Sequence, residues 1–182
     1  TADCLDSLVS ILINHNDVKG VSELDYVTAT LSIFNSLAMY KELRPQLMKT
    51  GWLLQEATQY MSCAEGMSRS KEQRVLAASL LGTIALDDEH RKAMVFKLPI
   101  KLLDHVMRAL ESEEGEVLEK IVWLVRTLSN NDAICGKIAD STKIIELILD
   151  ERAILKSSRL DEHILVLCEN MITKLNTPAI HQ

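Results

Sequence analysis

An apolar pattern recurs three times along this chain of 182 residues, at an interval that constrains the fold more than any other feature. The copies run over residues 31–38, 80–85 and 122–129, and each is followed by a second apolar segment at 52–54, 100–103 or 144–147. Their matching positions, Leu37, Ile84 and Leu128, are separated by 47 and 44 residues. Self-similarity at this period is typical of a solenoid, in which each repeat buries its apolar face only by stacking on its neighbours.

The composition favours helices over strands. Hydrophobic residues make up 47% of the chain and aromatic residues only 4%, with 6 glycines and 3 prolines. Leu, Ala and Glu are good helix formers, whereas aromatic residues are enriched in strands. The length suits one or two domains, and no change in composition divides the chain, so we predict a single all-α domain.

Each copy of the pattern predicts a long helix, a short helix and a second long helix. The apolar residues are spaced three and four positions apart, as on one face of a helix. The predicted helices cover residues 26–39, 41–48 and 52–63 in the first copy, 72–86, 89–96 and 100–110 in the second, and 117–128, 132–139 and 143–150 in the third. Asp87 or Asp88, and Asn131 or Asp132, have side chains suited to cap the start of a short helix.

The order of these helices resembles the armadillo-repeat family, whose units have three helices. Gly51, Pro99 and Thr142 hold the same place in the three copies, at the bend into the third helix. The resemblance implies a right-handed α-solenoid with repeats over residues 26–63, 72–112 and 117–151, and with partial repeats at 1–14 and 161–182. In the two-helix HEAT repeat, which is the nearest alternative, the short helices would merge with their neighbours.

The two partial repeats indicate that the stack is incomplete by itself. Residues 4–14 match a third helix without the two helices before it, and residues 161–175 match a first helix. Terminal repeats of solenoids normally have a polar outer face, but Leu5, Leu8 and Leu12 with Val9 form an apolar stripe near residue 1. We therefore expect a fragment of a larger protein, or a chain whose ends are covered by a partner.

The armadillo resemblance also implies where a partner binds, because the third helices of such repeats line a concave groove. The residues predicted to face it are polar and of mixed charge, which suits hydrogen bonding to an extended or helical peptide. They are Trp52, Gln55, Gln59, Lys101, Asp104, His105, Arg108, Lys143 and Glu146. Thr58 and Ser62 are predicted to be solvated on the same face. The alternative for each residue is an ordinary solvated helix surface that binds nothing.

The two tryptophans have different predicted roles. Trp52 is either an exposed anchor for a partner, since Trp is enriched in interface hot spots, or it packs under the bend after Gly51. Importin-type armadillo repeats carry an Asn four residues after such a Trp. Glu56 stands there in this chain, which disfavours a nuclear-import receptor. Trp123 lies within a long apolar helix, so we predict it in the core.

Catalytic and metal-binding patterns are missing from the sequence. It has no His-Glu-x-x-His motif, no Gly-rich phosphate loop and no nucleophile motif. The acidic and histidine clusters at 87–90 and 161–163 lie at helix starts, where acidic residues stabilise the positive end of the helix dipole. The four cysteines form no Cys-x-x-Cys pair, so we predict reduced structural thiols in an intracellular protein, either cytoplasmic or nuclear.

Charge and hydropathy narrow the partners further. The formal net charge of −6 disfavours binding to nucleic acid, which requires a basic face. No apolar run approaches the ~18 to 20 residues that cross a membrane. We therefore predict a non-catalytic protein–protein interaction scaffold, without cofactor or metal, that binds a peptide or a helical segment of another protein through the groove or through its exposed ends. The alternative is a self-association module that forms a dimer or filament within a larger multi-domain protein.

Overall fold

The computed structural model describes residues 23–62, 70–112, 115–154 and 158–175, and every regular element in these ranges is a helix. The helices are α2 (Glu23–Ala38), η2 (Lys41–Leu43), α3 (Arg44–Lys49), α4 (Gly51–Ser62), α5 (Lys71–Ile84), α6 (Asp88–Lys92), η3 (Ala93–Lys97), α7 (Leu102–Ser112), α8 (Glu116–Leu128), α9 (Asp132–Asp140), α10 (Thr142–Ile154) and α11 (Ser158–Leu175). The all-α prediction is confirmed. The helix predicted at 4–14 lies outside the described residues.

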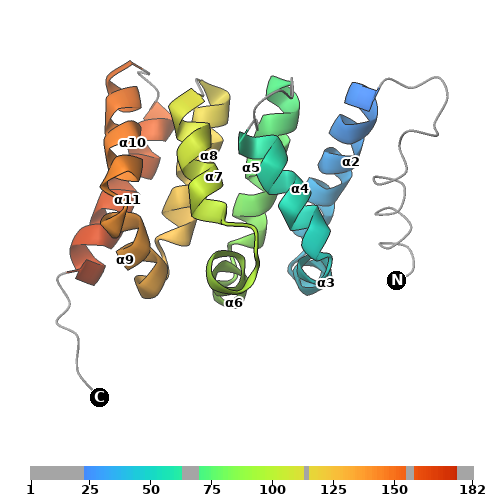
Figure 1. Cartoon of the computed structure of the whole chain (residues 1–182), viewed down its shortest axis with the longest axis horizontal. Coiled ribbons are helices and arrows are strands. Elements are labelled where there is room, and N and C mark those ends of the chain that lie inside the picture. Colours follow the sequence, from blue (N-terminus) through green and yellow to red (C-terminus); the bar gives the residue numbers. More distant parts are fainter. Residues whose placement is uncertain (1–22, 63–69, 113–114, 155–157, 176–182) are drawn as a thin grey trace.

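The short helices stay separate from the long ones, as three-helix repeats require. They are α3 with η2, α6 with η3, and α9, and they lie together at the lower end of the stack (Figure 1). The segment η3 has the wider π-helical turn. This arrangement differs from the two-helix HEAT alternative, in which the short helices would be continuous with their neighbours.

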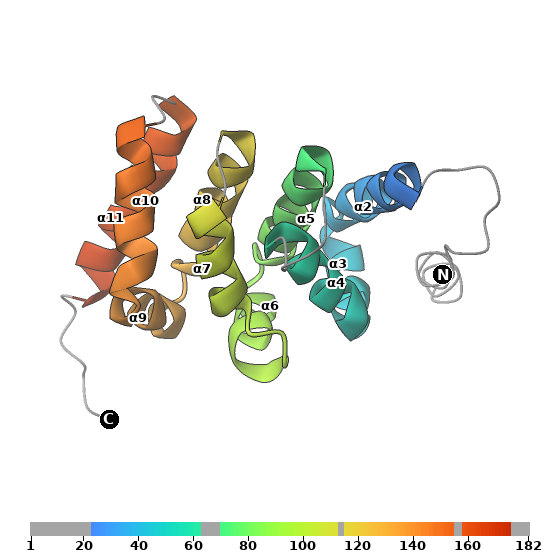
Figure 2. The ribbon, with the colours of Figure 1, turned by 45° about the horizontal axis from the view of Figure 1, so that its top comes forward.

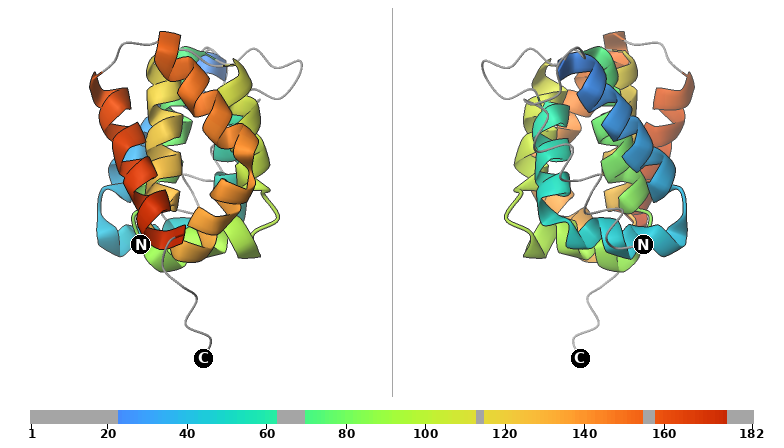
Figure 3. Two further views of the ribbon diagram at one scale, coloured as in Figure 1. Left: turned by 90° about the vertical axis from the view of Figure 1, so that its left-hand side faces the viewer. Right: turned by 90° about the vertical axis from the view of Figure 1, so that its right-hand side faces the viewer.

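The long helices form two layers, which we name layer A (α2, α5, α8 and α11) and layer B (α4, α7 and α10). Successive helices of each layer lie side by side along the stack (Figure 1, Figure 2). Figure 3 looks along the stack and shows the two layers on opposite sides, with the short helices across the lower end. Packing between neighbours is more extensive in layer A than in layer B. Closer packing on one side is what the inner face of a curved solenoid shows.

The apolar positions of the repeated pattern form one continuous core between the layers. Phe34, Leu54, Leu81, Leu118 and Leu128 are among its completely buried side chains. The core extends from α2 to α11, so each repeat buries its apolar face against the next one. None of the described helices combines the length and the apolar character needed to cross a membrane.

Arginines of the short helices cap the C-terminal ends of α2 and α5. Nε of Arg44 donates to the carbonyl of Ala38 at 2.8 Å, and Nη1 of Arg91 donates to the carbonyl of Ala85 at 3.1 Å. Each arginine follows its acceptor by six residues and is nearly buried. The last carbonyls of a helix have no partner within the helix. These bonds therefore supply donors to carbonyl oxygens that would otherwise be buried without one.

The third repeat solves the same problem with a residue from outside the repeat. Cys135 stands six positions after Ser129, where the earlier copies have arginine, and it is buried. Nζ of Lys174 on α11 instead donates to the carbonyl of Asn130 at 2.8 Å. The bond at this end therefore comes from the following helix, and it is made to Asn130, the exposed residue after the C-cap Ser129.

Polar bonds also join successive repeats at the starts of the short helices. Nη1 of Arg44 donates to Oδ2 of Asp87 at 3.0 Å, and Nδ2 of Asn131 donates to Oδ1 of Asp88 at 2.9 Å. Asn131 also caps α9, as predicted, because its Oδ1 accepts from the amide of Ile134. Asp87 occupies the N-cap position of α6 but makes no side-chain cap bond, because its carboxylate is bonded to Arg44. These bonds fix how one repeat sits on the next.

Helices α5 and α8 are in close contact at Gly82. A β-carbon at this glycine would lie 2.2 Å from Cζ3 of Trp123, well inside the contact distance of two carbon atoms. The indole ring of Trp123 therefore lies directly on the backbone of α5. Only glycine leaves room for it at this position.

We expect Gly82→Ala to destabilise the fold although alanine is the better helix former. The overpacked methyl group should cost about 1 to 3 kcal/mol in the free energy of unfolding, measured by urea denaturation followed by circular dichroism. Gly136→Ala in α9 is the matched control, because a β-carbon there meets nothing within 4 Å. It should stabilise the chain by up to about 1 kcal/mol. Equal effects of the two substitutions would contradict the close contact.

Candidate functional site

The nine residues predicted to bind a partner all belong to layer B or to the bend before α7. Trp52, Gln55 and Gln59 are on α4, Asp104, His105 and Arg108 are on α7 after Lys101, and Lys143 and Glu146 are on α10. Six of them are exposed, whereas Trp52, Gln59 and His105 are partly buried. The structure thus brings the nine residues onto one side of the stack. Their role in binding stays a prediction.

Several residues predicted on this side are engaged within the protein. Nζ of Lys143 pairs with the carboxylate of Glu111. Nδ1 of His105 lies 2.6 Å from Oγ of Ser62, which links α7 to the end of α4. Asp104 lines a hollow between α7 and α9, together with Leu103, Met107, Lys137, Asp140 and Ser141.

The predicted solvent exposure of Thr58 and Ser62 is wrong. Thr58 has an exposed fraction of 0% and donates to the carbonyl of Leu54 at 2.6 Å, and Ser62 has an exposed fraction of 2%. Both are buried because α4 packs against α5 on one side and α7 on the other. A helix with two neighbours buries a wider face than the apolar stripe of its sequence indicates.

Trp52 packs against the hydrophobic core and is partly buried. The sequence left two roles open for Trp52, an exposed anchor or packing under the bend after Gly51, and this position fits packing. Trp123 is more exposed than the core position that was predicted for it. Although its ring packs on Gly82, the side chain is only half-buried and reaches the surface of layer A.

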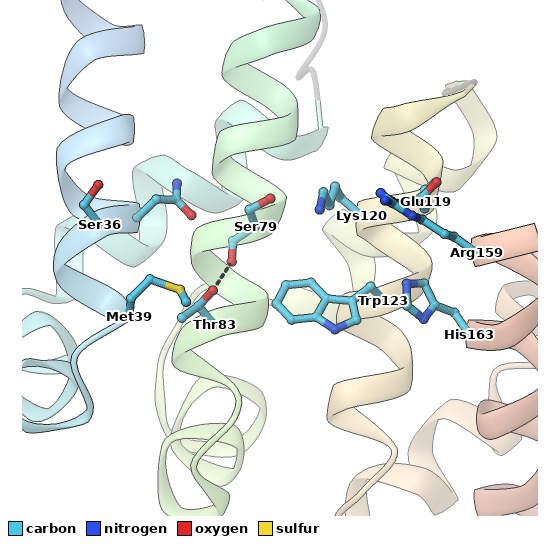
Figure 4. Close-up of a pocket in the computed structure, with 10 residues that line it drawn as sticks. Ser36, Met39, Ser79, Thr83, Glu119, Lys120, Trp123, Arg159 and His163 are labelled. Atoms are coloured by element: carbon cyan, nitrogen blue, oxygen red, sulfur yellow. Dashed lines mark hydrogen bonds and ion pairs between the residues drawn. The ribbon is translucent and has the colours of Figure 1, made fainter.

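A surface depression of about 490 Å³ crosses layer A, and we call it the layer A depression. It is lined by 10 residues from all four helices of the layer, namely Asn35, Ser36, Met39, Ser79, Thr83, Glu119, Lys120, Trp123, Arg159 and His163. The indole of Trp123 lies in its middle and points from α8 toward Thr83 on α5, with His163 of α11 on its other side (Figure 4). None of the nine residues predicted from the sequence lines it.

The half of the depression formed by α2 and α5 is uncharged and offers hydrogen-bond acceptors. Nδ2 of Asn35 donates to the carbonyls of Leu76 at 2.7 Å and of Leu31 at 3.0 Å, which leaves its carbonyl oxygen as an acceptor. The hydroxyl groups of Ser36 and Thr83 donate to carbonyls one turn earlier in their own helices. Their oxygen atoms therefore also present lone pairs rather than hydrogens.

The half formed by α8 and α11 is charged. Nη1 of Arg159 lies 3.8 Å from Oε1 of Glu119, and Nζ of Lys120 lies 6.0 Å from the centre of the Trp123 ring. Nη1 of Arg126 is 3.0 Å from Nδ1 of His163. Because a guanidinium only donates hydrogen bonds, His163 must accept on Nδ1 and is held as the neutral ring.

The surroundings of His163 favour its neutral form. Burial lowers the pKa of His163 below its ordinary value, and the positive charge of Arg126 lowers it further. Glu119 and Glu162 act in the opposite direction and Lys120 in the same one, but burial is the largest influence. His163 is therefore a fixed acceptor for Arg126 at neutral pH.

The acidic and histidine clusters noted in the sequence form no metal-binding group in the part of the chain that the structure describes. Within the described ranges, no group of three or more His, Cys, Asp or Glu side chains could hold a metal ion. Of the two clusters noted in the sequence, Asp87 is bonded to Arg44, and His163 is bonded to Arg126. What the depression offers is an aromatic surface between an acceptor half and a cationic half.

Sequence reasoning missed the residues of the layer A depression because it placed the groove on the other long helix of each repeat. The signal was present, since Asn35, Ser36, Ser79 and Thr83 interrupt the apolar pattern of the first long helices. The repeat can be counted from the short helix instead, as α3–α4–α5 and α6–α7–α8. Counted in this way, α5, α8 and α11 are the third helices.

Comparison with known proteins identifies the fold. No family model and no curated protein matches the sequence. Two solved structures of designed proteins are similar to this one, each with a TM-score of 0.69 and each covering 90% of this chain. One is a designed armadillo repeat protein in complex with the peptide (KR)4, at 15% identity, and the other is from computationally designed armadillo repeat proteins for modular peptide recognition, at 14% identity.

These similarities show an armadillo-like α-solenoid, as the resemblance in the sequence implied. The chain matches 62% of the length of each designed protein.

The low pKa of His163 predicts a loss of stability on acidification. The unfolded chain binds a proton to histidine at an ordinary pKa of about 6.5, whereas the folded chain binds it only at a lower pH. The free energy of unfolding should therefore fall as the pH drops from 7 to 5. His163→Gln keeps an acceptor for Arg126 but does not titrate, so its stability should fall less over the same range. Chemical denaturation at pH 7, 6 and 5 measures the free energy of unfolding of the wild type and of His163→Gln. An identical dependence on pH in the two proteins would contradict the prediction. His105, whose pKa burial also lowers, is unchanged in both proteins.

Proposed function

We propose that this chain is a non-catalytic protein-binding scaffold that holds a peptide segment of a partner protein in the layer A depression. The fold supports a binding role, because a similar designed armadillo repeat protein was solved with a bound peptide. The position of the depression carries the proposal: it crosses all four helices of the more closely packed layer. A surface that spans several repeats matches an extended segment better than a small molecule.

The side chains in the depression suit an extended peptide backbone. Asn35, Ser36 and Thr83 present acceptors for backbone N–H groups, and Lys120 and Arg159 present donors for carbonyl oxygens. Trp123 supplies a broad apolar surface at the centre, which is the usual position of an interface hot spot. Met39, with an exposed fraction of 69%, adds an apolar contact at the α2 end.

We expect Trp123→Ala to weaken peptide binding at least tenfold, because truncation of a central aromatic anchor typically costs about 2 kcal/mol or more. The peptides would be selected from a random 12-residue display library on the immobilised chain, and affinities measured by fluorescence anisotropy. Trp52→Ala, on layer B, is the matched control and should change the affinity less than about twofold.

A second variant separates binding from folding. Met39→Ala removes an exposed side chain, so the fold is retained while an apolar contact is lost, and binding should weaken about threefold. Two results would refute the proposed site. One is failure of the library to yield any binder. The other is that Trp52→Ala and Asp104→Ala lose binding while Trp123→Ala and Met39→Ala bind as tightly as the wild type. The second result would assign the site to the layer B residues predicted from the sequence.

Self-association is a second candidate function, supported by the outer face of α11. Leu165 and Ile172 have exposed fractions of 60% and 64% and lie seven residues apart, on one side of the helix. In this candidate the end of the stack packs against a second copy. Sedimentation equilibrium should then show a dimer or larger species, and Ile172→Glu should convert it to a monomer. Phe96→Glu, at an exposed apolar residue on η3, is the control; a wild-type chain that is monomeric at all concentrations would exclude this candidate.

A further inference from the structure

Several basic residues of the described chain are held in ion pairs with nearby carboxylates. Arg44 is paired with Asp87, Arg91 and Lys92 with Asp88, and Lys174 with Asp132. Lys120, like Lys49 and Lys97, makes no ion pair within the described ranges, and its Nζ lies 6.0 Å from the centre of the Trp123 ring. The positive charge of Lys120 is therefore available to a ligand.

Two further cations belong to this end of the site: Arg159 lines the depression with Lys120, and Arg126 is bonded to the lining residue His163. Arg159 has a side chain that is 78% exposed, and its distance of 3.8 Å from Glu119 makes a long, solvated pair of little strength. Arg126 is half-buried and donates to the neutral ring of His163, which supplies no negative charge. A guanidinium has five donors, so each arginine retains donors for another acceptor.

The charge of this site opposes that of the whole chain. The chain has a formal net charge of −6, but the α8 and α11 half of the depression is lined by Lys120 and Arg159, and its lining residue His163 is bonded to Arg126. Glu119 is the carboxylate that lines the depression, and Glu162 lies near His163 without lining it. Among the lining residues of this half, Lys120 and Arg159 therefore outnumber Glu119, while Arg126 and Glu162 near His163 balance each other.

We infer that the layer A depression selects an acidic peptide, whose carboxylates bind Lys120 and Arg159 while a neighbouring apolar side chain packs on Trp123. This inference rests on the proposed function and adds the chemistry of the partner. The remaining part of the peptide lies over α5 and α2, where Ser79, Thr83 and Asn35 are uncharged. Carboxylates and guanidinium groups form strong charge-assisted hydrogen bonds, which gives this half its selectivity.

The same charges reject the type of peptide found with the similar designed protein. The peptide (KR)4 carries positive charges only, and these would face Lys120 and Arg159 in this chain. Like charges brought together at an interface suppress a wrong partner. The two proteins share a fold, but we expect this chain to prefer peptides of the opposite charge to (KR)4.

Three peptides of equal length test the inference on the full chain. Each has eight residues with a central Phe, and the other seven are Asp and Glu, Ser and Gln, or Lys and Arg. At 50 mM NaCl we expect the acidic peptide to bind about tenfold or more tightly than the neutral one, and the basic peptide to bind weakest. The advantage of the acidic peptide should shrink as the salt concentration rises, because salt screens exposed charges.

Charge reversal locates the effect. The double variant Lys120→Glu with Arg159→Glu should lose about tenfold or more in affinity for the acidic peptide and should gain affinity for the basic one. The double variant Lys49→Glu with Lys97→Glu makes the same change in net charge at exposed positions on the short helices, and should leave the ratio of the two affinities near that of the wild type.

The outcomes separate this inference from the proposed function. Equal affinity for the acidic and neutral peptides, or a preference for the basic one, overturns the inference while peptide binding at Trp123 stands. An equal loss of acidic binding in the two double variants also overturns it, because the effect would then come from net charge alone. If no peptide binds, including those selected from the library, both fail.

Discussion

The contact between Gly82 and Trp123 is the constraint on which the central part of the structure depends. Without a β-carbon at Gly82, α8 can place an indole ring directly on the backbone of α5. The contact brings two successive helices of layer A together and leaves the other side of the ring half-exposed in the depression. A single glycine thus joins the packing of the repeats to the surface on which binding is proposed. Any larger residue would separate the helices or displace the ring.

The ends of the helices show how a repeat can vary without loss of the stack. Two repeats cap their C-terminal carbonyls with arginine, whereas the third has a buried cysteine and borrows a lysine from α11. The physical requirement is a partner for the last carbonyls of the helix: an unpartnered buried carbonyl costs about 1 to 3 kcal/mol, although the exposed Asn130 could also bond to water. The residue that meets it is not conserved between copies, so the repeat is recognised by its apolar pattern and not by its polar residues.

The two layers differ in how their polar side chains are placed. Layer B, with α4 buried between α5 and α7, includes polar residues such as Thr58 and Ser62 that are bonded within the protein. Layer A presents its polar residues toward a shared depression, with acceptors over α2 and α5 and cations over α8 and α11. Under the proposed function, this asymmetry along the stack would favour a peptide of one charge. The inferred choice of an acidic peptide is thus a property of side chains that the fold leaves free to vary.

Within the described ranges, the sequence by itself determined the order of the long and short helices, the three-helix form of the repeat and most of the core positions. These follow from apolar spacing, and the copies of the pattern reinforce one another. Only the tertiary structure decided which long helices carry the depression, that Trp123 reaches the surface and that Thr58 is buried. The reason is physical: a helical pattern specifies which face of a helix is apolar, but the neighbours determine how much of the remaining face is covered. In a solenoid those neighbours lie about 45 residues away, so each helix acquires its exposed surface only when the stack is assembled.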